Sequence, residues 1–168
     1  MGIMRWRQIL EVVGVASVVG GLLLVAFEVR QANRIARAQV VMELSSGFNE
    51  INSARFIDAD FARLVMLLAN PESQAISELD ESRITGLAYQ IHNVMWAAQT
   101  AYDDDLLGRE DLENYRNDLA GTYDSWPGIV PALIAIYETQ PGKKDAYVFG
   151  PLAEWAAEAA QCGVDLNT

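Results

Sequence analysis

The hydrophobic and polar positions divide the chain into a short apolar segment and a long amphipathic remainder. Residues 12–27 (VVGVASVVGGLLLVAF) are sixteen consecutive uncharged residues near the N-terminus. The apolar segment reaches 21 residues, 9–29, when Glu11 and Glu28 lie at the two membrane interfaces. About 20 mostly apolar residues let an α-helix cross the hydrocarbon core of a bilayer. The pattern therefore predicts one transmembrane helix, with residues 1–30 as a membrane anchor.

Two other interpretations of the apolar segment stay open. Arg5 and Arg7 fit the basic start of a cleaved signal peptide. However, the segment is longer than the apolar part of most signal peptides, and no A-x-A-like cleavage site directly follows it, because Ala36-Arg37-Ala38 comes too late. A helix buried in a soluble domain is the other alternative. Trp6 favours the anchor, because tryptophan is enriched at the membrane interface.

After residue 30 the apolar residues recur every three or four positions, which is typical of amphipathic helices. No stretch alternates convincingly with a period of two, so no sheet is expected. The fold class is predicted to be all-α, with the transmembrane helix continuing into a compact bundle of about five helices in residues 31–168. The repeats are Val41, Leu44, Phe48 and Ile51; Phe61, Leu64, Val65 and Leu68; Ile84, Leu87, Ile91, Val94, Met95 and Ala98; Leu112, Tyr115, Leu119 and Tyr123; Leu133, Ile134 and Tyr137; and Leu152, Trp155, Ala156 and Ala159.

Local signals predict where these helices begin and end. Ser77 and Asp80 have the spacing of a capping box, and Asn70-Pro71 and Pro141-Gly142 are breaks. The aspartates at 103–105 are expected to belong partly to the start of the fourth helix, because negative charge is unfavourable at a helix C-terminus. Most aromatic residues are expected in the core, while Trp126 and Phe149, beside Pro-Gly breaks, are expected closer to the surface.

Small residues in the apolar segment are the most specific feature of the anchor. Ala16 and Gly20 form one small-xxx-small pair, Ser17 and Gly21 form another, and Gly14 lies on the side of the second pair. Small residues let helix backbones approach closely in lipid. These five positions are predicted to pack against a helix of another chain, since a single span has no transmembrane partner in its own chain.

The charge is unevenly distributed along the acidic chain. Residues 1–37 contain five arginines and two glutamates, a net charge of +3, whereas residues 38–168 carry −14, which together give −11. The acidic part is expected to repel nucleic acid. Arg30, Arg34 and Arg37 form one helical stripe that suits a cytoplasmic headgroup layer, so Trp6 and these arginines are predicted to lie at the membrane interface. Arg5 and Arg7 flank the other end of the segment, so the charge difference between the two flanks is small, and the arginine stripe favours a cytoplasmic domain.

The first forty residues resemble a family of bacterial single-pass membrane proteins with no assigned activity. The shared pattern is an apolar segment that opens with a glutamate and a glycine, followed by an arginine-rich helix start. It reads here as Glu11-Val12-Val13-Gly14, then residues 27–34 (FEVRQANR) and Ala36-Arg37-Ala38. The resemblance implies an all-helical, acidic domain after an inner-membrane anchor. It implies no functional residues.

No group of residues in the domain matches the pattern of a known catalytic or metal site. Counted from Asp103, a calcium loop would need a polar fifth residue and a glutamate at the twelfth, but Leu107 and Asn114 stand there. His92, the only histidine, lacks the glutamate three residues earlier that di-iron bundles use, and is expected to be partly buried in the core. Cys162 is the only cysteine, so no intramolecular disulfide is possible. We expect no cofactor and no catalytic residue.

The sequence thus favours a non-enzymatic accessory subunit of a membrane complex, with other transmembrane subunits or a second copy as partners. A membrane-anchored sensor or regulator, whose domain binds a small ligand or a cytosolic partner, is the main alternative. An enzyme based on two carboxylates with separated pKa values is the weakest of the three hypotheses.

Overall fold

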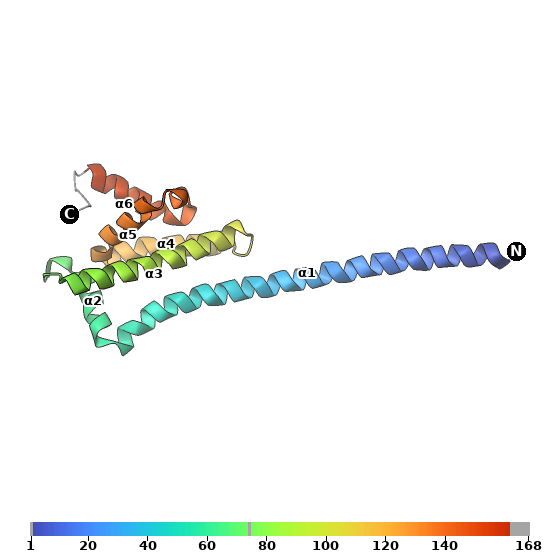
Figure 1. The fold of residues 1–168 in the computed structure, drawn as a ribbon, viewed down its shortest axis with the longest axis horizontal. Coiled ribbons are helices and arrows are strands. Elements are labelled where there is room, and N and C mark those ends of the chain that lie inside the picture. The colour runs from blue at the N-terminus through green and yellow to red at the C-terminus, as the bar shows by residue number, and fades with distance from the viewer. Residues whose placement is uncertain (1, 74, 162–168) are drawn as a thin grey trace. The chain divides into compact units, whose positions relative to one another are not determined.

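The computed structural model describes residues 2–73 and 75–161, and helices make up nearly all of this part (Figure 1). The described residues contain no strand, which confirms the all-α prediction. The six α-helices are α1 (Gly2–Ile57), α2 (Ala59–Ala69), α3 (Glu78–Asp103), α4 (Arg109–Ser125), α5 (Val130–Thr139) and α6 (Gly150–Gln161). Four short 3₁₀ helices join them: η1 (Pro71–Ser73), η2 (Pro127–Ile129), η3 (Pro141–Lys143) and η4 (Tyr147–Phe149).

The chain divides into two compact units, Met1–Gln39 and Val40–Thr168. The first is the N-terminal part of α1, and the second contains the end of α1 and the helices α2–α6. The boundary expected from the sequence, at residue 30, is the end of the apolar segment. The boundary between the two compact units falls later, after Gln39, because α1 from Val40 onward belongs to the same compact unit as the other helices.

Helix α1 runs without a break through the apolar segment and beyond the polar Ser45-Ser46-Gly47 stretch. It is long and apolar enough to cross a membrane, and no residue of its most apolar stretch is buried by the rest of the chain. The side chains of Val12, Leu22 and Phe27, for example, are 68%, 65% and 65% exposed. Burial in the chain's own core, one of the alternatives from the sequence, therefore does not describe this segment.

A cap at Asp58 separates α1 from α2. Its carboxylate accepts hydrogen bonds from the backbone N–H groups of Asp60 (2.8 Å) and Phe61 (3.1 Å), which satisfies donors that the first turn of a helix leaves free. The predicted capping box is also present: Ser77 caps α3, and its N3 residue is Asp80. Arg63 of α2 forms an ion pair with Asp80, and this contact is the main reason that the pKa of Asp80 falls to about 2.

The core of the bundle forms around α3. Its apolar residues recur at helical spacing and pack against α4 and α5, and the two helices α3 and α4 lie side by side in Figure 1. The 3₁₀ helix η4 inserts Val148 and Phe149, both 0% exposed, into this core. Buried Gln99 holds η4 in place, because its Oε1 accepts a hydrogen bond from Val148 N (3.1 Å) while its Nε2 donates to Asp103 Oδ1 (2.9 Å).

Two local expectations from the sequence are wrong. Asp103 is the last residue of α3 and Asp104 is its C-cap, while Asp105 forms the following turn at φ 58°, so none of the three begins α4. Phe149 is fully buried rather than near the surface, since the short η4 turns its side chain toward α3. Trp126 is partly buried against the core.

Candidate functional site

A groove of about 650 Å³ lies in the second unit. One wall is the last part of α1, and the other is the length of α4. Three buried residues, Ile51, Ile91 and Leu107, also line it. The remaining lining residues are Val41, Ser45, Phe48, Asn49 and Asn52 from α1; Asp111, Asn114, Tyr115, Asn117, Asp118, Gly121, Thr122 and Ser125 from α4; and Trp126.

The α4 wall is a polar stripe with helical spacing. Asp111, Asn114 and Asp118 follow at i, i+3 and i+7 and thus share one face of the helix. The α1 wall contributes the amides of Asn49 and Asn52. Among the described lining residues there are two carboxylates and no basic side chain, so the groove is a negatively charged hollow.

Aromatic side chains form the apolar part of the groove. The rings of Phe48 and Tyr115 stack across it from α1 and α4, with centroids 5.6 Å apart and planes 19° apart. Trp126 lines the groove where α4 ends. A hollow of this size with convergent polar groups and an apolar base matches the usual dimensions of a small-ligand site.

Two ionisable groups in the groove, Tyr115 and Asp118, have raised pKa values. Asp118 is exposed on the surface of α4, yet partial desolvation between the walls raises the pKa of its carboxyl group. Desolvation also raises the pKa of the Tyr115 phenol, and the negative charges of Asp111 and Asp118 add to this effect, while a hydrogen bond with Ser45 opposes it. Asp118 therefore has a carboxylate that is less well hydrated than one in open solvent.

A second hollow, of about 400 Å³, lies between α4, η4 and α6. Two of its charged side chains, Arg116 and Glu154, pair with one another. Arg116 forms an ion pair with Glu154 at 3.1 Å, and the guanidinium groups of Arg109 and Arg116 lie 4.0 and 4.8 Å from the ring centre of Tyr147. These contacts hold α6 and η4 on α4, which is a structural role.

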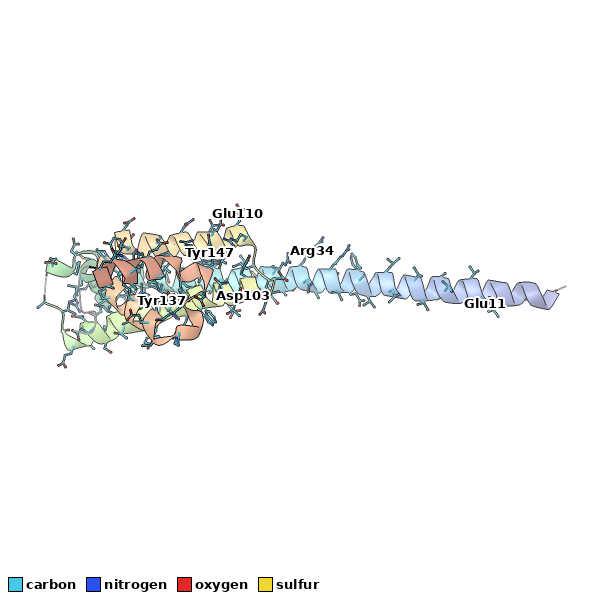
Figure 2. The ribbon with its side chains drawn as sticks, turned by 90° about the horizontal axis from the view of Figure 1, so that it is seen from above. Glu11, Arg34, Asp103, Glu110, Tyr137 and Tyr147 are labelled. Atoms are coloured by element: carbon cyan, nitrogen blue, oxygen red, sulfur yellow. The ribbon has the colours of Figure 1, made fainter. Side chains whose placement is uncertain are left out.

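The site residues predicted from the sequence lie in the first unit, on α1. A Cβ atom added to Gly14, Gly20 or Gly21 would meet nothing within 4 Å, and Ala16 is exposed. The Ser17 hydroxyl donates to Val13 O (2.8 Å) inside the helix. Trp6 is 68% exposed, and Arg30, Arg34 and Arg37 are exposed; Arg34 projects from α1 in Figure 2.

His92 is more deeply buried than the sequence predicted. It is 0% exposed and stacks on Phe149 with ring centroids 4.7 Å apart, and among the described residues neither ring nitrogen has a hydrogen-bond partner of acceptable geometry. Burial lowers the pKa of His92, and the charge of Lys143 lowers it further, while nearby Asn93 opposes the shift. Within the described residues no three His, Cys, Asp or Glu side chains lie close enough to hold a metal. Cys162 lies outside the described residues.

The bundle is expected to lose stability as the pH falls from about 7 to 5 because of His92. Its folded-state pKa lies below the ordinary value of about 6.5, so the unfolded chain binds the proton first and the free energy of unfolding falls with pH through this window. His92→Leu, which removes the titrating group at similar volume, should flatten this dependence. Tryptophan fluorescence melts of the detergent-solubilised chain at several pH values measure it; an equal pH dependence in the variant would contradict the assignment.

Sequence reasoning missed the groove. The α4 residues that line the groove share one helical face, but polar residues occupy nearly every side of α4, so its sequence does not single out that face. What the sequence did not supply was the pairing of α1 with α4. Comparisons with known proteins give no further help, since no family model, curated protein or solved structure matches the chain.

Proposed function

We propose that the protein is a non-enzymatic accessory subunit of a membrane protein complex. The N-terminal part of α1 crosses the cell inner membrane, and the acidic bundle lies at the cytoplasmic surface. The observation that carries this proposal is the apolar part of α1, which is long enough to span a bilayer and is 0% buried in its own chain.

The small residues of this segment support a helical partner rather than lipid alone. Gly14, Ser17 and Gly21 fall on one side of the helix, with Ala16 and Gly20 on the adjacent side. The Ser17 hydroxyl donates a hydrogen bond within the helix, so this face exposes no unsatisfied hydrogen-bond donor to lipid. Close approach of a second helix would supply the packing that drives association in membranes.

The arginine stripe supports the proposed orientation. Arg30, Arg34 and Arg37 are exposed just beyond the apolar segment, and the described residues give none of them an ion-pair partner. Anionic headgroups of the cytoplasmic leaflet attract such arginines by about 1 kcal/mol each. Trp6 would lie at the opposite interface.

Replacing Gly14, Ser17 and Gly21 together by leucine tests the helix-packing face. We expect about a tenfold loss of the assembled complex, because three bulky side chains separate the backbones. Native gel electrophoresis of detergent extracts measures the assembled fraction. Val12, Val15 and Val19, which lie on the opposite side of α1, are changed to phenylalanine as the matched control. An unchanged assembly in the leucine variant, or equal losses in both, would contradict the proposal.

A second function is favoured by one observation, the groove between α1 and α4. A membrane-anchored sensor or regulator would use such a groove to bind a small ligand at the membrane surface. The two functions are compatible, because the packing face and the groove lie in different units of the chain.

A further inference from the structure

The groove between α1 and α4 combines negative charge with an elongated form. Its α1 wall extends from Val41 to Asn52, roughly 17 Å along the helix axis. Its two carboxylates, Asp111 and Asp118, stand on the same face of α4. We infer that this groove binds a linear aliphatic polyamine, with one ammonium group at each carboxylate. This inference is independent of the anchor and goes beyond the role of an accessory subunit.

The spacing of the carboxylates selects a long ligand with more than one charge. Asp111 and Asp118 are seven residues apart, which places them roughly 10.5 Å apart along α4. A single divalent cation requires oxygen ligands within about 2.6 Å and does not bridge that distance. An extended triamine chain has terminal nitrogens at a comparable separation, so both of its ends reach a carboxylate.

The walls between the carboxylates suit the body of such a ligand. The rings of Phe48 and Tyr115 stack on one another, and the pair supplies an apolar surface against which the methylene groups of the ligand pack. The side-chain oxygens of Asn49, Asn52 and Asn114 are acceptors for N–H donors along the chain. Charge-assisted hydrogen bonds to Asp118, which is partly desolvated, are stronger than those to a fully hydrated carboxylate.

The volume of the groove favours a small molecule over a peptide helix. A helix with its side chains is about 10 Å or more across, and a length matching the α1 wall would occupy more than about 650 Å³. The absence of basic residues from the described lining leaves the carboxylates without an internal counter-ion.

Titration of the full-length chain in non-ionic detergent with spermidine, followed by calorimetry at low salt, tests the inference. We expect saturable 1:1 binding that weakens as salt is added. Asp118→Asn and Asp111→Asn should each weaken binding about tenfold or more, because each removes a charge-assisted contact. Glu110→Gln is the matched control: it removes one charge from the same helix, outside the groove and on a side chain that points outward (Figure 2), and should leave binding unchanged.

Two further ligands show whether the spacing matters. Butylamine, with one ammonium group, should bind at least about tenfold more weakly than spermidine. A peptide of residues 30–41, which carries the arginine stripe, should not compete. The inference would be overturned if spermidine binding did not saturate, or if Asp118→Asn bound spermidine as tightly as the unmodified chain. Equal affinity for butylamine would also overturn it, as would Asp118-dependent binding of the peptide in place of spermidine. Tryptophan fluorescence melts confirm that the variants are folded.

Discussion

Changing Val18 and Leu22 together to arginine is expected to release the protein from the membrane. Both residues lie near the middle of the apolar segment, one helical turn apart, with side chains 63% and 65% exposed. Each arginine at the centre of a transmembrane helix costs about 2.5–3.5 kcal/mol on insertion scales. Two of them shift the insertion equilibrium by roughly four orders of magnitude, which exceeds what the remaining apolar residues supply.

Alkaline extraction of the membrane fraction measures this effect, with the variant expected in the supernatant and the unmodified chain in the pellet. The matched control places arginine at Met66 and Tyr89, which are exposed positions of the bundle. Two added charges there should leave the protein in the pellet. Complete retention of the Val18 and Leu22 variant would show that something other than the apolar segment holds the protein at the membrane.

Phe149→Ala is expected to produce the largest loss of stability in the bundle. The ring is fully buried, stacks on His92 and Trp96 at 4.7 and 6.4 Å, and meets Tyr137 edge-on at 6.3 Å. Its removal leaves a cavity where η4 joins α3 and α5, and buried Phe→Ala changes cost about 3–5 kcal/mol.

A fall in the melting temperature of roughly 10–20 °C follows for a domain of this size. Fluorescence melts report it, because Trp96, Trp126 and Trp155 all lie in the bundle. Tyr89→Ala is the control: this aromatic residue of α3 is 46% exposed and should change the midpoint by only a few degrees. Equal effects at the two positions would contradict the central place of Phe149 in the core.

The helices were predictable from the sequence because their signals are local. Ser77 and Asp80 form their capping box within four residues, and Asn70-Pro71 ends α2 through the missing N–H of proline. The long apolar segment needs only its own length and composition to be identified. The periodicity of residues 41–51 likewise indicated which side of α1 faces the bundle, where Leu44 and Ile51 are buried.

Features that depend on distant contacts were not predictable in this way. Phe149 stands beside Gly150-Pro151, a local signal of exposure, yet the hydrogen bond from Val148 N to Gln99, 49 residues earlier, draws η4 into the core. The groove depends on α1 lying opposite α4, and no local pattern specifies that pairing. The aspartates at 103–105 follow α3 rather than begin α4, and Asp103 is held at the end of α3 by a hydrogen bond from Gln99 that helix-dipole considerations do not include.

Association in the membrane is the central claim, and native co-purification tests it most directly. The native membrane is extracted in mild detergent, the chain is recovered through a C-terminal tag, and the co-migrating proteins are identified and quantified by mass spectrometry. We expect a reproducible set of membrane partners, or a second copy of this chain, at a fixed ratio that is lost in the Gly14, Ser17 and Gly21 leucine variant. A chain that migrates alone as a monomer would contradict it.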